Sequence, residues 1–401
     1  MMIDFEVARA ALLEQHPCRL RTVTLPLAEA ANRVLAQSLH AKYPSPMFDN
    51  SAMDGYAVCD SKGSLREFCI TGRIQAGETA ENPLAQGEAV RIFTGAPLPP
   101  NTTAVIMQEQ TETDGARLLV NADIQAGQNM RLKAEEIEVG QELLAQGTLL
   151  NMAALGLAAS QGYAELMVYE PLKVRVFSTG NELVEPGQTL SDGQIYDANR
   201  YQLLAWLQQQ PGLQVSDGGI LPDDLAQTEA ALAAAAEQFD VVITSGGASV
   251  GEADYLKQAI GHIGSLTMHT LAIKPGKPFA WGHIGECKIF ILPGNPVATF
   301  ATSNMLLLPV LNQLAGKQAR HCYLQKVTAK AAFQTKKAIK RREFLRVVLE
   351  NDEAGGTVVK LLPNQGSAML STCAAADALC EVPAGQTVSE GDNVSVYLLP
   401  N

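Results

Sequence analysis

The sequence predicts a multidomain protein of the α/β plus β class, with a doubly wound, mostly parallel α/β domain. The first observation is the length, because 401 residues correspond to roughly two to four domains of ordinary size. The second is a regular alternation of strand-like and helix-like segments over residues 171–318, which is typical of βαβ units. The third is that short, turn-separated β-like runs occur on either side of that alternation.

The N-terminal region, residues 1–170, is expected to combine helices with an inserted β-rich subdomain. Residues 5–15 and 26–37 carry apolar side chains at helical spacing. The prolines of the segment YPSP then stop any helix, and short β-like runs follow from about 45 to 145. Helical spacing returns over 150–162, so the β-rich segment is interpreted as an insertion between helices.

The central region, residues 171–318, contains the segments that predict a buried parallel sheet. Its strand candidates are apolar and several are β-branched, as expected when helices cover both faces of a sheet. The expected order is the strand KVRVFS, a helix over 198–209, the strand LQVSDGGI, a helix over 225–238, the strand DVVITS, a helix over 255–263, the strand KIFIL and a helix over 296–315. Residues 319–401 alternate in the β manner and predict a separate antiparallel sheet or small barrel.

Composition and charge exclude several classes of function. The chain has 42 acidic and 30 basic residues and a formal charge of −12, which disfavours bulk nucleic-acid affinity. No apolar run approaches the ~20 residues needed to span a bilayer, and the first residues resemble no targeting signal, so a cytoplasmic protein is expected. The cysteines form no C-x-x-C pair and the histidines no i, i+4 pair, so neither a disulfide framework nor a zinc site is indicated.

The most informative segment is TSGGASVGEAD, residues 244–254, which follows a predicted strand and opens a predicted helix. Gly246 and Gly247 allow positive φ and close backbone approach, and exposed N–H groups at a helix start favour an anion. Ser245, Ser249 and Asp254 add polar groups within the same eleven residues. The pattern matches neither a P-loop nor a dinucleotide fingerprint. A plain glycine-rich turn is the alternative, and it explains the glycines equally well.

A second strand-to-helix turn, LPGNPVATF, offers further backbone donors if its strand neighbours the strand DVVITS. Its Asn295 suits an N-cap and Pro296 a first helical turn, which is the structural alternative. Three other loops are expected at the same sheet edge, and they carry Glu182, the pair Asp223–Asp224, and the lysines Lys274 and Lys277.

These carboxylates have two interpretations. The acidic pair could simply begin the helix 225–238, where negative charge favours the helix dipole. Alternatively, Glu182, Asp223 and Asp254 hold Mg²⁺, a hard cation that keeps several water or phosphate ligands. Lys274 and Lys277 would then neutralise an oxyanion, although solvation is the commoner explanation for surface lysines.

Two further segments carry charge. In the β-rich region, FDNSAMDGYA contains Asp49 and Asp54, for which Asx turns or a catalytic carboxylate are both possible. The basic run KKAIKRREFLR, 336–346, suggests a nucleic-acid patch. Because the whole chain has a net charge of −12, a solvated face is the preferred interpretation. One arginine of this run could turn toward an anionic ligand.

Eight segments, taken together and in order, resemble the MoeA family of molybdopterin molybdenumtransferases, which is related to the E domain of gephyrin. They are FDNSAMDGYA, FTGAP, VIMQEQT, FSTGNEL, DGQIYDANR, TSGGASVGEADY, LAIKPGKPFAWG and LPGNPVATF. The resemblance covers essentially the whole chain. It implies the insertion of molybdate into adenylylated molybdopterin, with Mg²⁺-dependent release of AMP, by an elongated homodimer with a shared active site.

The resemblance also implies which residues act. Asp54, Glu182, Asp223 and Asp254 would be catalytic, and Asp223 and Asp254 would bind the metal. The pterin and molybdate would contact Thr94, Ser245, Gly246, Gly247, Ser249, Lys274, Lys277, Pro293, Gly294, Asn295, Pro296, Arg346 and Ser367.

The chain departs from the family's better-known bacterial pattern at two positions. Thr270 stands where that pattern has a lysine, and Glu136 where it has an aspartate. A non-catalytic pterin-binding or scaffold protein of the same fold is the alternative function. The enzyme is preferred because all four carboxylates are present. Its expected partners are molybdate, the pterin, other cofactor-synthesis proteins and apo-molybdoenzymes, with neither nucleic acid nor membrane.

Overall fold

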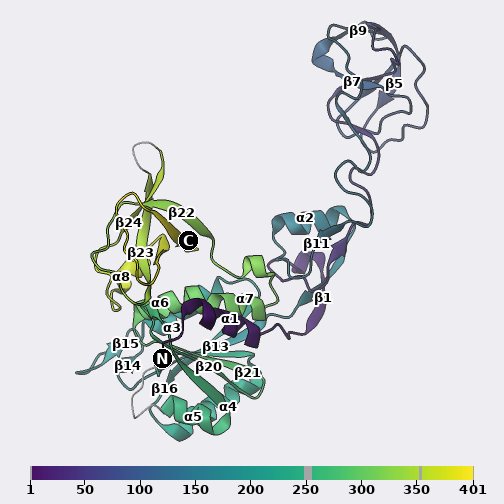
Figure 1. Cartoon of the computed structure of the whole chain (residues 1–401). Coiled ribbons are helices and arrows are strands. Elements are labelled where there is room, and N and C mark those ends of the chain that lie inside the picture. Colours follow the sequence, from purple (N-terminus) through teal and green to yellow (C-terminus); the bar gives the residue numbers. More distant parts are fainter. Residues whose placement is uncertain (1, 248–254, 352–354, 401) are drawn as a thin grey trace. The chain divides into compact units, whose positions relative to one another are not determined.

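The computed structural model describes residues 2–247, 255–351 and 355–400. The chain divides into two compact units (Figure 1). The smaller unit comprises Ser38–Ala145 and Gly156–Ala164, and the larger one comprises Met1–Gln37, Gln146–Leu155 and Glu165–Asn401.

The larger unit is built on a six-stranded sheet with the order β16-β13-β17-β21-β20-β18. Its strands are β13 (Leu172–Thr179), β16 (Leu213–Leu221), β17 (Val241–Ser245), β18 (Ser265–Thr270), β20 (Pro278–Ile284) and β21 (Cys287–Leu292). The first four strands of the order are parallel to one another, whereas β20 runs antiparallel to both of its neighbours. The mostly parallel sheet is therefore confirmed, with an antiparallel strand near one edge.

Helices cover both faces of this sheet, as the alternation predicted (Figure 1). One face packs against α1 (Phe5–Gln15), α3 (Asn199–Gln208), α6 (Pro296–Thr302), the π-helical turn η3 (Ser303–Leu307) and α7 (Leu308–Leu314). The other face packs against α4 (Leu225–Gln238) and α5 (Tyr255–Ile263). Alternation within β17 shows why: Val241 and Ile243 are buried in the first core, and Val242 in the second.

The N-terminal region confirms two predicted helices and corrects a third. The helix over residues 5–15 is α1, and 150–162 contains α2 (Met152–Ser160). Residues 26–37 are not a helix: β1 (Thr22–Pro26) pairs with β12 (Glu165–Tyr169), and a 3₁₀ turn η1 (Leu27–Glu29) follows. The Leu35 N–H then donates to the Thr148 carbonyl, 2.9 Å away, so the backbone bonds across the chain rather than along a helix.

The C-terminal residues form a closed β-barrel. Its strands are β22 (Lys326–Ala331), β23 (Arg342–Asn351), β24 (Thr357–Leu361), β25 (Ala378–Val382) and β26 (Asn393–Leu398), with the short helices η4 (Ala319–His321) and α8 (Leu370–Ala374). Closure comes from β25, which pairs with both β26 and β23. A sixth, two-residue strand, β19 (Ile273–Lys274), joins β23 from the α/β domain.

The smaller unit contains a second six-stranded sheet, of order β7-β4-β6-β5-β9-β8. These strands are β4 (Gly55–Val58), β5 (Glu67–Ile74), β6 (Glu88–Ile92), β7 (Ala104–Met107), β8 (Thr111–Thr113) and β9 (Arg117–Val120), with η2 (Gln108–Gln110) between β7 and β8. Short two-stranded pairs are formed by β2 (Leu39–His40) with β11 (Glu142–Leu144) and by β3 (Asn50–Ser51) with β10 (Met130–Arg131). Among the described residues, no helix has both the length and the apolarity to cross a membrane.

Candidate functional site

The predicted site residues of the α/β domain gather at one edge of its sheet. Because β16, β13, β17 and β21 are parallel, their carboxyl ends meet there, and in register Ser178 pairs with Ser245 and Ser245 with Leu292. The loop that carries the two lysines reaches the same edge, since β18 ends opposite Pro278, the first residue of β20. In open α/β sheets, ligands bind outside the carboxyl ends of the strands. The predicted neighbouring strands DVVITS and KIFIL are confirmed as β17 and β21.

Two glycine turns lie against each other at this edge. Gly246 and Gly247 have φ of +96° and +73°, the left-handed region that favours glycine. A Cβ on Gly246 would lie 2.9 Å from the Thr179 carbonyl oxygen, and one on Gly294 would lie 3.8 Å from the Gly246 Cα. The Gly246 N–H donates to the Leu292 carbonyl at 3.3 Å. The backbones of the two turns are therefore in contact, and a side chain at Gly246 is disfavoured by the Thr179 carbonyl at the end of β13.

Asn199, the first residue of α3, connects these two turns and was not among the predicted site residues. Its Nδ2 donates to Ser245 Oγ and to the Gly294 carbonyl, both at 2.7 Å. The side-chain Oδ1 is buried and has no hydrogen-bond partner among the described residues. The available signal was a polar residue in the first turn of a predicted helix within the segment DGQIYDANR.

An ion cluster fixes the start of α3. Arg200 is 2 % exposed and donates to Asp197, Asp217 and Glu185. Burial disfavours its charge, but the hydrogen bonds to Asp197 and Asp217 outweigh that effect and raise the pKa of Arg200. Asp197 in turn accepts a hydrogen bond from Ser178 Oγ at 2.9 Å, at the end of β13. The cluster therefore fixes α3, and Asn199 with it, against the site edge.

The acidic pair at residues 223 and 224 divides between the two interpretations. Asp224 is the N-cap of α4, and its side chain accepts from the Gln227 N–H at 2.8 Å. Asp223 is exposed and accepts from the Asn181 N–H at 3.2 Å, while the Asn181 side chain accepts from the Asp223 N–H. Helix capping thus accounts for Asp224 alone. Asp223 instead ties its loop to the loop that carries Glu182.

Two of the three carboxylates predicted to bind Mg²⁺ lie in the described part of the chain. Glu182 and Asp223 are exposed carboxylates on linked loops, and carboxylate oxygens suit Mg²⁺. Ser249 and Asp254 lie outside the described residues. Within residues 2–247, 255–351 and 355–400, no group of three or more His, Cys, Asp or Glu side chains is arranged to hold a metal ion.

The second glycine turn, residues 293–296, leads into α6 and differs from the predicted capping arrangement. Asn295 occupies the N-cap position of α6 and Pro296 its first turn, but the Asn295 side chain makes no capping hydrogen bond. Thr299 Oγ1 instead donates to the carbonyl of buried Pro293 at 2.6 Å. The exposed Asn295 side chain is therefore not committed to capping the helix.

The predicted residues Lys274, Lys277, Arg346 and Ser367 differ in whether they are already engaged in contacts within the protein. Lys274 Nζ forms an ion pair with Glu343 at 2.7 Å, whereas exposed Lys277 forms none with the described residues. Arg346 is 1 % exposed and donates to Thr372 and to the carbonyls of Asn364 and Gly366. It thus holds the loop that precedes Ser367. The Ser367 carbonyl accepts from the Val297 N–H at 3.2 Å, at the start of α6.

In the smaller unit, the predicted residues Asp54 and Thr94 form a pair. The backbone N–H and the hydroxyl of Thr94 both donate to Asp54 Oδ1, at 2.8 and 2.9 Å. These two hydrogen bonds lower the pKa of Asp54 below its ordinary value and leave an exposed, ionised carboxylate. Gly55 must follow, because a Cβ there would overlap the Ile106 carbonyl of the neighbouring strand.

Comparison with known protein families covers nearly the whole chain. Residues 3–162 match the family model described as MoeA N-terminal region (domain I and II), and residues 328–399 match the MoeA C-terminal region (domain IV). Between them, residues 175–313 match a model described as probable molybdopterin binding domain, which contains the site edge.

Individual relatives agree. A molybdopterin molybdenumtransferase of Haemophilus influenzae is 41 % identical over 92 % of each chain. Molybdopterin molybdenumtransferase 2 of Mycobacterium tuberculosis is 33 % identical over 90 % of this chain and 91 % of that protein. A crystal structure of the molybdopterin biosynthesis moeA protein from Pyrococcus horikoshii is 27 % identical, covers 100 % of both chains and gives a TM-score of 0.84. The chain belongs to the MoeA family of molybdopterin molybdenumtransferases, which are enzymes of molybdenum cofactor biosynthesis.

Proposed function

We propose that this enzyme inserts molybdate into adenylylated molybdopterin and releases AMP, with Mg²⁺ required for the release. The observation that carries the proposal is the pair of glycine turns beside Asp223 at one sheet edge, inside the segment that matches the molybdopterin-binding family model. Backbone N–H groups at such turns favour phosphate, and close backbone approach leaves room for a flat ring.

In this proposal, the two turns hold the pterin and its phosphate. Gly246, Gly247 and Gly294 present backbone, while Ser245 and Asn295 add a hydroxyl and an amide, with Pro293 and Pro296 fixing the second turn. Ser249 would contribute from the same loop. Asn199 holds the first turn to the second, so we assign it the role of positioning Ser245.

Molybdate, a dianion, would bind beside the lysine loop. Lys277 is the better candidate for direct contact, since Lys274 is already paired with Glu343. The Ser367 loop is hydrogen-bonded to the first turn of α6, and the Ser367 hydroxyl would complete the oxyanion site. Arg346 would act by holding the Ser367 loop, because its own guanidinium is buried and hydrogen-bonded within the barrel.

Mg²⁺ would be held by Asp223 together with Asp254, and when bound it would supply Lewis-acid activation of the adenylyl phosphate. Glu182, tied through its loop to Asp223, would orient the attacking water. The exposed Asp54 carboxylate, kept ionised by Thr94, would serve as a general base or orienting group.

We further propose a cytoplasmic homodimer in which the smaller unit of one subunit serves the sheet edge of the other. A two-fold dimer forms two equivalent shared sites. The test is a mixed dimer of one Asp54→Ala chain and one Asp223→Ala chain. Both changes then fall in one site and leave the other intact, so about half of wild-type activity should return. Mixed dimers as inactive as their parents, with exchanged wild-type dimers active, would exclude the shared site.

The decisive test of function is reconstitution. Purified protein is incubated with adenylylated molybdopterin, molybdate, Mg²⁺ and an apo-molybdoenzyme, and both AMP release and activation of the molybdoenzyme are measured. We expect both signals, and loss of both in Asp223→Ala. Pterin binding without AMP release would instead identify a carrier. An inactive wild-type protein, in an assay validated with the Haemophilus influenzae relative, would contradict the proposal.

A further inference from the structure

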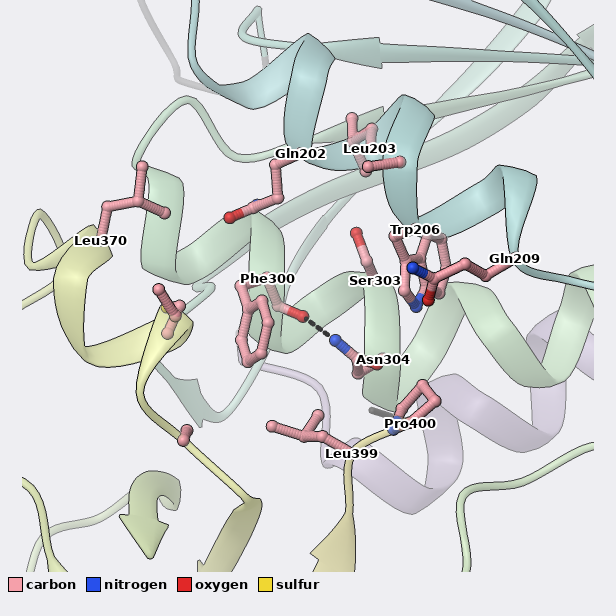
Figure 2. A pocket seen from close by; sticks show the side chains of 14 residues that line it. Gln202, Leu203, Trp206, Gln209, Phe300, Ser303, Asn304, Leu370, Leu399 and Pro400 are labelled. Carbon is pink, nitrogen blue, oxygen red and sulfur yellow. Dashed lines mark hydrogen bonds between the residues drawn. The ribbon is translucent and has the colours of Figure 1, made fainter.

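A cavity of about 480 Å³ lies among the helices that cover one face of the sheet (Figure 2). Its walls come from α3, from α6 and the π-helical turn η3, from α8, and from Leu399 and Pro400 at the end of the chain. This volume is within the range of small-molecule sites in proteins. None of the described residues that line it is charged, so its chemistry favours a neutral ligand.

Three polar side-chain atoms in this wall lack hydrogen-bond partners among the described residues. They are Trp206 Nε1 from α3, and Ser303 Oγ and Asn304 Oδ1 from η3. Ser303 and Asn304 are each 3 % exposed, and the Asn304 amide nitrogen already donates to the Phe300 carbonyl at 2.9 Å (Figure 2). Because buried polar groups are almost always paired, three unpaired ones around a single cavity require an explanation.

The unpaired atoms define a hydrogen-bonding pattern. Trp206 Nε1 can only donate, Asn304 Oδ1 can only accept, and the Ser303 hydroxyl can do either. A single group that pairs with these atoms therefore carries both an acceptor and a donor, as a secondary amide or a lactam does. Phe300, Leu203, Leu370 and Leu399 supply apolar surface around this group. Short π-helical turns such as Ser303–Leu307 occur frequently at functional sites.

Each helical wall of the cavity continues directly from a segment of the candidate site. Helix α3 begins at Asn199, which holds Ser245 and Gly294, and α6 begins at Pro296. Helix α8 follows the Ser367 loop, whose carbonyl accepts from the Val297 N–H. A shift of these helices around a bound molecule would therefore move both site turns.

We propose that this cavity is a regulatory site for a neutral, largely apolar small molecule with an amide or lactam group. The three polar atoms are covered in the present arrangement, so binding involves side-chain rotation of Ser303 and Asn304 toward the ligand. Occupancy of the site fixes α3, α6 and α8 relative to one another. The binding part of this proposal is independent of the reaction that the enzyme catalyses, and it is tested without substrate.

The test uses 2-quinolone, a neutral bicyclic lactam, and 2-methoxyquinoline, which has the same rings but no N–H donor. Calorimetry on the full chain should show one 2-quinolone per chain and at least fivefold weaker binding of 2-methoxyquinoline. Asn304→Leu and Trp206→Phe should each weaken 2-quinolone at least fivefold. Ala205→Phe should abolish binding, because Ala205 is an exposed residue of α3 that lines the cavity. Gln208→Phe, an exposed position on the same helix outside the lining, is the matched control and should bind normally.

Failure of wild-type protein to bind 2-quinolone, or equal binding by Ala205→Phe, would overturn the site. So would equal affinity for 2-methoxyquinoline, since the amide pattern would then be irrelevant. Self-association is followed by sedimentation over a range of protein concentrations. If 2-quinolone binds more weakly at the concentrations where the chain self-associates, a second copy of the chain covers the cavity and the proposal fails. Hydrogen exchange of the Val297 amide should slow at least threefold on saturation. An unchanged rate would overturn the coupling to the site.

Discussion

The sheet edge of the α/β domain and the Asp54–Thr94 pair of the smaller unit differ in which atoms are proposed to act and in how those atoms are positioned. At the edge, the functional groups are backbone atoms of turns that pack against each other, with Gly294 close to Gly246 and Asn199 joining both turns. In the smaller unit, the functional group is one exposed carboxylate, positioned by the two donors of one residue. Substitutions in the two packed turns should therefore affect folding together with binding, whereas those at Asp54 should affect chemistry alone.

A large effect on turnover is expected from Asp54→Asn. Loss of the ionised carboxylate should lower turnover by about 10²–10⁴-fold, the usual contribution of a general acid or base. The melting temperature should stay at the wild-type value, since the side chain is exposed. Asp114→Asn is the matched control, because Asp114 is also an exposed aspartate of the smaller unit with a pKa lowered by backbone N–H donors, here those of Arg117 and Ala116. Equal losses in both variants would remove the special role of Asp54.

Gly247→Val should weaken pterin binding by at least about tenfold, because a β-branched side chain would block backbone approach to the ligand. It should also lower the free energy of unfolding by about 1–3 kcal/mol, since valine is strained at positive φ. Gly285→Val is the control: Gly285 has φ of +56°, lies in the β20–β21 turn at the other end of the sheet, and has no atom within 4 Å of an added Cβ.

Calorimetry with molybdopterin and denaturant unfolding would be measured on both variants. We expect a similar loss of stability in each and a loss of binding only in Gly247→Val. Wild-type affinity in the folded Gly247→Val protein would reduce the segment TSGG to a plain turn.

A moderate effect is expected from Thr94→Val. The Thr94 donors lower the pKa of Asp54, so removing the hydroxyl should raise that pKa toward its ordinary value. Asp54 is then protonated at a higher pH. The acidic limb of the pH–rate profile should therefore shift to higher pH, with little change in rate near neutrality. Thr94→Ser retains the hydroxyl and should retain the wild-type profile. A limb that stays in place in Thr94→Val would show that a different group controls it.

The smallest effect is expected from Asp224→Ala, for which the neighbouring edge residue Asp223 supplies the comparison. Asp224→Ala should lower the free energy of unfolding by about 1 kcal/mol, the usual value of an N-cap, and leave activity unchanged. Asp223→Ala should do the reverse, abolishing AMP release while leaving α4 capped. Thermal unfolding and the AMP assay on both proteins would decide, and identical behaviour of the two variants would contradict the division of roles.

The local sequence pattern was sufficient to predict elements whose local preferences agree with their tertiary contacts. The helices over 225–238 and 255–263 have the predicted ends, because capping at Asp224 and apolar spacing agree with the sheet they cover. Residues 26–37 were misassigned because Ala30, Val34 and Leu35 are all buried at spacings that a helix would also produce. Their backbone groups bond to partners more than a hundred residues away, and no local signal reports such partners.

The candidate site likewise has features that local sequence predicts and features that depend on tertiary contacts. Placing four loops at one edge followed from the βαβ order alone, since parallel strands end together. The direction of β20 did not follow, because it depends on the short loop of residues 271–277 that reverses the chain after β18. Sequence could not distinguish Arg346 from an exposed arginine, because its burial depends on the barrel closing around it.

The two-residue strand β19 has a consequence for engineering chimeras of this enzyme. Ile273 and Lys274 pair with Arg342 and Glu343 of the barrel, while the loop that contains them belongs to the hairpin of the α/β sheet. The Lys274–Glu343 ion pair joins the same two segments. A recombination point near residue 318 would therefore separate segments that pair with each other in this structure. A transplanted barrel should function best when residues 271–277 come from the same parent, although they lie more than forty positions upstream of the junction.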